Sequence, residues 1–233
     1  MKKLGIIGGM GPLATQLLYK EITEHTEAEC DQEHIDMLII SHASMPDRTA
    51  AIRSGKTDEV FNLLLNDAKF LEENGAAAIA IPCNTSHYFF ERLQKKINIP
   101  IINMVSAAVE DAKRKNPNIK KIGILATDGT ISTGIYKKEC EKSGLEYFAP
   151  NDIHQKLVMK IIYEQIKKGI RGSDEDFAKI NAHLLENGCD AAILACTELS
   201  CFAKENGVSE FYTDALDALR DRAITICGAR IKK

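Results

Sequence analysis

The chain has 233 residues, of which 45% are hydrophobic and 27% charged, so it can bury a core as one large domain or two small ones. Its formal net charge of −3, with acidic and basic residues interleaved, argues against nucleic-acid binding. No stretch reaches the roughly 18 apolar residues of a membrane span, and glycines interrupt the apolar run near the start. We therefore expect a cytoplasmic protein with no nucleic-acid or membrane partner.

The cysteines do not form a disulfide or metal pattern. Their number, seven, is odd, which argues against complete pairing. Cys189, Cys196 and Cys201 lie close together in the sequence, but they lack the Cys-x-x-Cys spacing and the following histidine of a zinc site. We expect reduced thiols and no bound metal.

The first element is a predicted strand over residues 3–7, followed by a glycine-rich turn and a helix over about 13–27. Pro12 suits the first turn of that helix. The glycines fit neither the GxGxxG nucleotide fingerprint nor a phosphate-binding P-loop, which needs a following Gly-Lys-Ser/Thr. Two interpretations remain open: a turn that needs positive φ, and backbone amides that hold a small anion.

A second strand is predicted over residues 36–41, leading into a polar loop with Arg48 and Arg53. Each arginine is either an ordinary exposed side chain or a bidentate partner for a carboxylate. A helix opening at Thr57 ends at Asn74-Gly75, and a buried strand follows over 76–81. Further helices are predicted over about 86–97, 105–115, up to 143, 152–168, from Ser173 to 187, and 214–227, and further strands at 100–102, from 120, 146–148, 191–195 and 210–212.

Two stretches of the chain are repeated. A shift of 113 positions places the Glu-Asn-Gly of residues 73–75 on that of 186–188, and Cys83 on Cys196. The start, KKLGIIGGMG at residues 2–11, matches KKIGILATDG at residues 120–129. Alternating strands and helices in two similar halves predict an α/β fold of two Rossmann-like lobes with mainly parallel sheets and a cleft between them.

Cys83 and Cys196 each follow an apolar strand, and three interpretations compete for them. They are buried small hydrophobes, a redox pair, or two acid-base groups acting on one carbon from opposite faces. Inversion of a stereocentre needs a thiolate on one face and a thiol on the other. With each sulfur about 3.5 Å from the carbon, the sulfurs stand about 7 Å apart, too far for a disulfide.

Polar residues next to the cysteines are suited to the carbanion that such chemistry forms. Asn84, Thr85 and Thr197 can donate hydrogen bonds to carboxylate oxygens as negative charge builds, or they simply cap turns and helices. Glu198 either orients a substrate ammonium group or complements the positive end of a helix.

Four motifs in order resemble the cofactor-independent aspartate/glutamate racemase family, in particular its aspartate racemase branch. They are IGGMGP at 7–12, SMPDRT at 44–49, PCNTSH at 82–87 and ACTEL at 195–199, so the resemblance extends over nearly the whole chain. Glutamate racemases carry Cys-Thr-His at the second cysteine, whereas this chain has Cys-Thr-Glu. The resemblance implies residues 1–98 plus 209–233 as the first lobe, 99–208 as the second, and a homodimer without pyridoxal phosphate or metal.

The resemblance also implies roles for individual residues. Cys83 and Cys196 are the expected bases, and Arg48 is the expected clamp for a carboxylate of an amino-acid dicarboxylate substrate. A lysine at Lys167, or the adjacent Lys168, is expected to meet a carboxylate too. Met10, Asn84, Thr85, Thr197 and Glu198 are expected to contact the substrate.

We therefore expect interconversion of L- and D-aspartate, with glutamate or other amino acids as further substrates. A maleate cis-trans isomerase, in which one cysteine attacks a double bond, is the alternative on the same scaffold. A non-catalytic amino-acid-binding protein is the third candidate.

Overall fold

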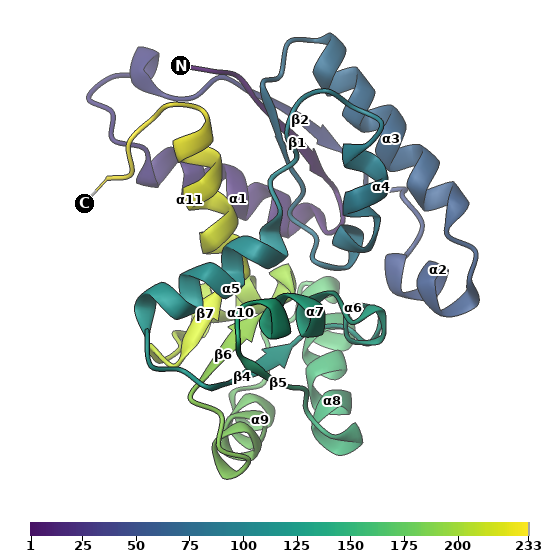
Figure 1. Ribbon diagram of the computed structural model, residues 1–233, viewed down its shortest axis with the longest axis vertical. Coiled ribbons are helices and arrows are strands. Elements are labelled where there is room, and N and C mark those ends of the chain that lie inside the picture. The colour runs from purple at the N-terminus through teal and green to yellow at the C-terminus, as the bar shows by residue number, and fades with distance from the viewer. Residues whose placement is uncertain (233) are drawn as a thin grey trace. The chain divides into compact units, whose positions relative to one another are not determined.

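The computed structural model describes residues 1–232 (Figure 1). The chain divides into two compact units, each with its own sheet. The first unit contains Met1–Met104 and the chain from Leu216 onward, and the second contains Val105–Ala215. The two sheets and their flanking helices confirm the predicted α/β fold with parallel sheets. Among the described residues, no helix is long and apolar enough to cross a membrane.

The sheet of the first unit has three parallel strands in the order β2-β1-β3. Strand β1 (Leu4–Gly8) lies in the middle and is buried along its whole length, which explains its unbroken apolar sequence. Its neighbours are β2 (Met37–Ser41) and β3 (Ala78–Ala80). The helices of this unit are α1 (Pro12–His25), α2 (Arg48–Ser54), α3 (Asp58–Glu73), α4 (Phe90–Gln94) and α11 (Ala215–Ile226).

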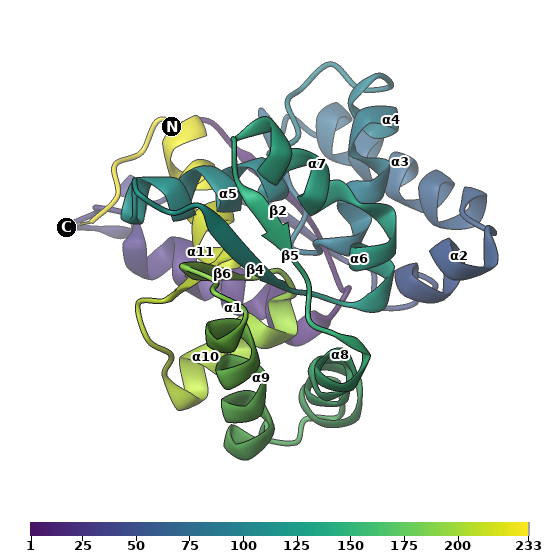
Figure 2. The ribbon, with the colours of Figure 1, turned by 60° about the horizontal axis from the view of Figure 1, so that its bottom comes forward.

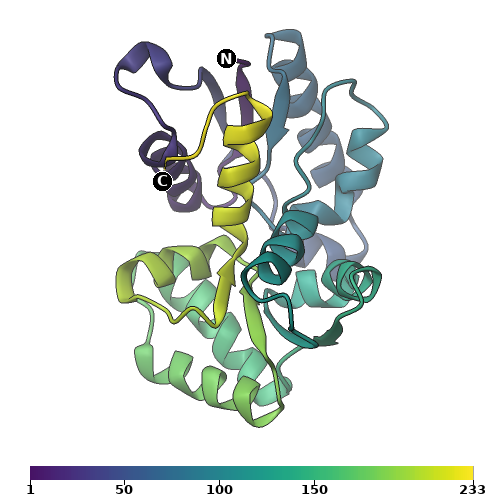
Figure 3. The ribbon, with the colours of Figure 1, turned by 60° about the vertical axis from the view of Figure 1, so that its left-hand side comes forward.

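The C-terminal helix α11 returns to the first unit and lies next to α1 (Figure 3). Arg220 on α11 donates to Glu21 on α1 at 2.9 Å, and both side chains are largely buried. Asp217 and Asp221 also accept from Arg220, so its buried charge is surrounded by acceptors.

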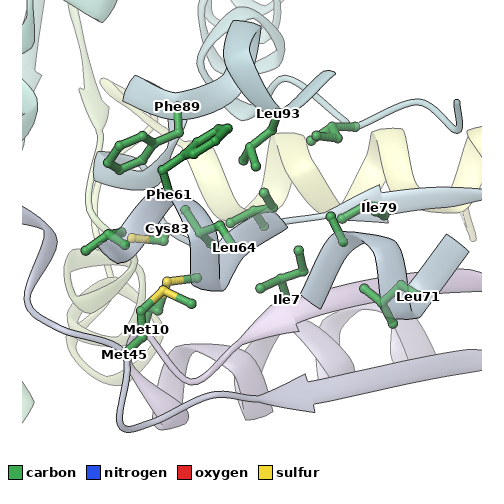
Figure 4. Close-up of a cluster of buried hydrophobic side chains, with 14 of the residues drawn as sticks. Ile7, Met10, Met45, Phe61, Leu64, Leu71, Ile79, Cys83, Phe89 and Leu93 are labelled. Atoms are coloured by element: carbon green, nitrogen blue, oxygen red, sulfur yellow. The ribbon is translucent and has the colours of Figure 1, made fainter. Parts of the chain in front are cut away.

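A cluster of apolar side chains packs between β1, β3 and the helices α3 and α4 (Figure 4). Leu64 and Leu71 of α3 are fully buried, because apolar residues recur along this helix at intervals of three and four. Met10, Met45 and Cys83 lie together at one end of the cluster. The core of the first unit therefore supports the segment that carries Cys83.

The sheet of the second unit has four parallel strands in the order β5-β4-β6-β7. Helices cover both faces, with α8 and α9 on one side and α5 and α7 on the other (Figure 2). Lys113 of α5 donates to the carbonyl of Ser143 at the end of α7, in keeping with a shared face. The strands are β4 (Lys121–Leu125), β5 (Glu146–Phe148), β6 (Ala191–Leu194) and β7 (Tyr212–Asp214), and the helices are α5 (Met104–Lys115), α6 (Asp128–Thr133), α7 (Ile135–Lys142), α8 (Asp152–Met159), α9 (Asp174–Glu186) and α10 (Thr197–Asn206).

Several local predictions differ from the structure. The prediction of a polar loop after β2 is wrong from Arg48 onward, where the structure has helix α2. Asp47 caps this helix, because its side chain accepts from the Ala50 amide. The helix predicted over 86–97 is a 3₁₀ segment (Thr85–Phe89) followed by α4. The helix predicted over 152–168 changes after α8 into a π-helical segment (Lys160–Gln165) and a 3₁₀ turn (Ile166–Lys168).

Two strand assignments also shift. The predicted strand at 100–102 is a single bridge between Ile101 and Ile79, which belongs to the first unit. The predicted strand at 210–212 lies two residues further on as β7, which pairs with β6 in the second unit. The expected boundaries at 98/99 and 208/209 would instead assign Ile101 to the second unit and β7 to the first.

Candidate active site

Cys83 lies at the carboxyl end of β3, in a turn that is fixed by its own backbone. Its amide donates to the Ile81 carbonyl at 2.7 Å, and its carbonyl accepts from the Ser86 amide at 3.2 Å. The side chain is only 6% exposed. Asn84 and Thr85 follow directly and are buried as well. The thiol therefore lies at the polar exit of a strand, within a segment that has little freedom to move.

The turn after β1 contacts the Cys83 segment through the side chain of Met10. Gly9 has a φ of +86°, which confirms the predicted need for a left-handed residue. The hydroxyl of Ser86 donates to the sulfur of Met10 at 3.4 Å. The strand register agrees with this contact, because β1 and β3 are parallel neighbours and the turns that follow them leave the same edge of the sheet.

Arg48 is a buried arginine whose guanidinium group donates to backbone carbonyls. Nη1 reaches Met45 and Pro46 at 3.1 and 3.0 Å, and Nη2 reaches Met10 at 3.2 Å. These bonds fasten the start of α2 to the turn after β1. Its expected role as a carboxylate clamp stays a prediction, beside this bracing role that the sequence did not indicate.

Cys196 lies at the carboxyl end of β6 and is the N-cap residue of α10. Its carbonyl accepts from the Leu199 amide at 2.9 Å, and its side chain is 7% exposed. Thr197 and Glu198 occupy the first turn of the helix and are buried. The helix α10 had no predicted range, although one interpretation of Glu198 places it at a helix start and an Asn-Gly pair at residues 206–207 marks the helix end.

The thiol of Cys196 belongs to a hydrogen-bonded chain of three side chains. It donates to Oε2 of Glu198 at 3.0 Å, and Oε1 of Glu198 accepts from Nζ of Lys167 at 2.6 Å. The side chain of Glu198 is 7% exposed and that of Lys167 24%. Lys167 is therefore the lysine that reaches this site, and Lys168 is exposed.

Burial raises the pKa of the Cys196 thiol well above its usual value, and the negative charge of Glu198 raises it further, while Lys167 opposes the shift. The group is thus held as a thiol with a proton acceptor beside it. Local backbone geometry brings Lys167 into reach, because it follows the π-helical segment, a distortion that is frequent at functional sites.

The two cysteines therefore have different surroundings despite their matching positions in the repeat. Cys83 precedes a 3₁₀ turn and the neutral residues Asn84 and Thr85, whereas Cys196 caps an α-helix next to an ion pair. The predicted site residues fall into two groups, one in each unit. Met10, Arg48, Cys83, Asn84 and Thr85 belong to the first unit, and Lys167, Cys196, Thr197 and Glu198 to the second.

One part of the second group was missed by the sequence analysis. Leu125 of β4 pairs with Leu194 of β6, so Thr127 and Cys196 each lie two residues beyond the paired ends of adjacent strands. The Thr127 hydroxyl accepts from the Thr130 amide, and Asp128 accepts from Gln155 at 2.9 Å. The repeat contained the signal, because Asp128 matches Met10.

Within residues 1–232, no three His, Cys, Asp or Glu side chains are grouped so as to hold a metal ion. Cys83 and Cys196 are unpaired, as are Cys30, Cys140, Cys189, Cys201 and Cys227.

Solved structures similar to this chain include two aspartate racemase-like proteins. The Picrophilus torridus aspartate racemase superimposes with a TM-score of 0.83 at 30% identity, covering 100% of this chain and 97% of that one. A Pyrococcus horikoshii aspartate racemase homologue has a TM-score of 0.78 at 28% identity, covering 97% and 99%.

Curated relatives by sequence include two racemases of other specificity. The broad specificity amino-acid racemase RacX of Bacillus subtilis is 26% identical over 84% of this chain and 86% of its own length. A glutamate racemase of Aquifex pyrophilus is 32% identical over 64% of this chain, and the match spans 56% of that enzyme's length.

The model of the Asp/Glu/hydantoin racemase family matches residues 7–218, which include all four motifs and both cysteine segments. The fold and the two cysteine-bearing strand ends agree with that match. This chain therefore belongs to the Asp/Glu/hydantoin racemase family.

Proposed function

We propose that this protein is an aspartate racemase that interconverts L- and D-aspartate with two thiols and no cofactor. The observation that carries the proposal is the buried Cys196 thiol, which donates to Glu198 while Lys167 pairs with that carboxylate. A buried thiol with an adjacent proton acceptor is suited to give and take a proton. The second thiol, Cys83, ends a strand in the same way in the other unit.

The reaction needs one thiolate and one thiol. In one direction the Cys83 thiolate removes the α-proton, which leaves a carbanion beside the substrate carboxylate. The Cys196 thiol then delivers its proton to the opposite face, so that one C–H bond breaks and another forms. The reverse direction starts from the state that this leaves, in which Cys196 is the thiolate that removes the α-proton and Cys83 is the thiol that delivers its proton. In the free protein, where Cys196 donates to Glu198, that carboxylate is placed to take the Cys196 proton while Cys83 gains one from solvent.

Stabilisation of the carbanion is the hardest part of the reaction, because a proton next to a carboxylate is weakly acidic. Donors aimed at the carboxylate oxygens lower this barrier. We assign that role to Asn84, Thr85 and Thr197, which are buried next to the two thiols in the sequence. Asn84 supplies an amide, and the two threonines supply hydroxyl groups.

Aspartate is the proposed substrate because of the Picrophilus aspartate racemase similarity and the Glu198 side chain, which replaces the histidine of the glutamate enzymes in the Cys-Thr-His motif. The RacX and glutamate racemase relatives make glutamate and other amino acids further candidates. The expected homodimer is part of the same proposal, and sedimentation velocity measures it.

The test is an assay with purified protein, without pyridoxal phosphate and with a metal chelator, on the L- and D-forms of aspartate, glutamate and neutral amino acids. We expect aspartate to be racemised fastest. The Cys83→Ala and Cys196→Ala variants should each lose racemisation in both directions, while Cys30→Ala, which removes an exposed thiol, should keep it. Racemisation of none of these substrates by the wild-type protein would contradict the proposal.

A further inference from the structure

His87 is a buried histidine in the Cys83 segment for which the proposed mechanism has no use. The residue is 6% exposed, and its ring stacks on that of Phe90 with the ring centroids 6.2 Å apart. The sequence motif at 82–87 contains it, but the proposed chemistry does not explain why a histidine should stand there.

The ring connects the backbone of Cys83 to the start of α5. Nδ1 lies 3.0 Å from the carbonyl oxygen of Cys83. On the other side of the ring, the amide of Met104 donates to Nε2 at 3.1 Å, and the carbonyl of Ile102 lies 3.3 Å from the same nitrogen. One side chain thus joins two segments that are 17 residues apart in the sequence.

These contacts select one form of the imidazole. A carbonyl at Nδ1 requires an N–H there, and the Met104 amide requires a lone pair on Nε2. The neutral ring with its proton on Nδ1 satisfies these two contacts, which are the shorter ones, and leaves the Ile102 carbonyl at 3.3 Å without a bond from the ring. A proton on Nε2 could serve Ile102 but would point an N–H toward the Met104 amide. Burial also lowers the pKa of His87, which favours the neutral ring.

His87 thus bridges the Cys83 carbonyl and the Met104 amide, and each of these groups has a structural role of its own. The Cys83 carbonyl belongs to the residue that carries the thiol, and it also accepts from the Ser86 amide, so the turn is held from two sides. The Met104 amide is one of the first N–H groups of α5, which have no partner within the helix. The chain passes from the first unit to the second between Met104 and Val105.

We propose that His87 is a positioning residue for Cys83: the neutral imidazole holds the Cys83 turn by its carbonyl and anchors that turn to the start of α5. The catalytic consequence of this inference rests on the proposed function. The structural part is independent of that function, because the position of the Cys83 thiol can be measured without turnover.

The first experiment uses the wild-type protein. Long-range ¹H–¹⁵N NMR correlation of ¹⁵N-histidine-labelled protein at pH 7 reports the protonation of each ring nitrogen. We expect His87 as the neutral ring with its proton on Nδ1, assigned by its loss in a His87→Gln variant. An imidazolium, or the proton on Nε2, would overturn the proposal.

The second experiment compares His87→Phe, which removes both hydrogen bonds, with His87→Gln, whose amide can both donate and accept. His183→Phe is the matched control, because His183 is a buried histidine of the second unit that also accepts a backbone amide, that of Asn151. Iodoacetamide labelling followed by mass spectrometry gives the modification rates of Cys83 and Cys196. Cys196 is a fair internal reference, because the two thiols are similarly exposed, at 6% and 7%.

In His87→Phe the ratio of Cys83 to Cys196 modification should change by about fivefold or more, since a displaced thiol meets a different environment. The kcat for racemisation should fall by about 10–100-fold with KM changed by less than about threefold, as for a misplaced catalytic group. His87→Gln should bring both the modification ratio and kcat most of the way back to the wild-type values. His183→Phe should leave the ratio unchanged.

An unchanged modification ratio in a folded His87→Phe protein would overturn the proposal. If His87→Phe does not fold, the NMR measurement on the wild-type protein still decides it, because an imidazolium or a proton on Nε2 overturns the proposal. Absence of racemisation by the wild-type protein would count against the proposed function alone, because the labelling ratio and the tautomer do not depend on turnover.

Discussion

At the level of single residues, the two proposed bases differ in what surrounds them. Cys196 is coupled to a carboxylate and an ammonium group, whereas Cys83 is held by neutral hydrogen bonds to its backbone. The high pKa of the Cys196 thiol means that this group is protonated at neutral pH in the absence of substrate. It is therefore suited to deliver a proton first, and in the free protein Glu198 is the acceptor through which it can become a thiolate.

The chain through Glu198 gives a direct prediction. Glu198→Gln removes the proton acceptor while keeping the size of the side chain, so kcat should fall by about 10²-fold or more, as for the loss of a general base. Lys167→Ala should reduce kcat by a smaller factor, because the carboxylate stays. Stopped-assay kinetics in both directions measure these effects.

Lys168→Ala is the matched control for Lys167→Ala, because Lys168 is adjacent in the sequence and exposed. Its kcat and KM should stay within about twofold of wild type, as for most exposed substitutions. Equal losses in the Lys167 and Lys168 variants would remove the assignment of Lys167 to the site.

Residue types and their neighbours in the sequence were enough to select both cysteines and the residues that follow them as candidates. They did not predict the bonds between Lys167 and Glu198, because 31 residues separate the two and only the packing of the π-helical segment brings them together. The role of Arg48 was also hidden, since binding to three carbonyls depends on the path of two loops.

At the level of secondary structure, the turn from β1 to α1 is tightly restricted by its glycines. A methyl group on Gly9 would lie 2.4 Å from the backbone nitrogen of His42, and the φ of +86° is unfavourable for any L-residue with a side chain. This close approach fixes Met10 next to the Cys83 segment.

Gly9→Ala should therefore destabilise the protein strongly, by more than about 3 kcal/mol, because backbone atoms cannot move aside as a side chain can. Gly55→Ala is the control: its φ is +73°, but no atom lies within 4 Å of the added methyl group. It should cost only about 1–2 kcal/mol from the left-handed conformation. Urea unfolding followed by circular dichroism measures both, and similar losses in the two variants would contradict the close-contact argument.

Elements with a strong local signal were predicted well. The strand at 146–148 is confirmed, and Ser173 caps α9 by accepting from the Asp176 amide, as its spacing indicates. The short helices α2 and α10 were missed, because their polar sequences contain no long apolar period. Tertiary contacts decide such elements more than local propensity does.

At the level of the whole molecule, buried thiols link stability to pH. Burial raises the pKa of Cys140 and of Cys201 to about 12, with nearby carboxylates adding to the shift. The folded protein thus keeps both protons at a pH at which the unfolded chain, with a thiol pKa of about 8.5, loses them. The stability that this provides is complete below about pH 8.5 and is lost as the pH rises toward 12.

We expect the free energy of unfolding, measured with urea under reducing conditions, to fall between pH 9 and pH 11 by up to about 1.4 kcal/mol per pH unit for each thiol. The Cys140→Ala/Cys201→Ala double variant should be less stable at pH 7, because it loses buried atoms, yet show a shallower decline. Parallel declines in the two proteins would contradict the assignment.

Two similar α/β halves follow from the repeat in the sequence, since residues 2–11 and 120–129 form equivalent strand-to-helix turns. The path of the chain between the halves does not follow from it. Ile101 pairs with the first sheet and β7 with the second because of register and side-chain packing, which the repeat does not encode.

The most direct test of the two-thiol account is racemisation of L-aspartate in D₂O, stopped at low conversion, with separation of the enantiomers and mass analysis of each. Two bases on opposite faces predict that the D-aspartate formed carries one deuterium on its α-carbon, while the recovered L-aspartate stays unlabelled. The same asymmetry should appear when the reaction starts from D-aspartate. Equal labelling of both enantiomers from the earliest times, or a product that retains the original proton, would show a single base and contradict the account.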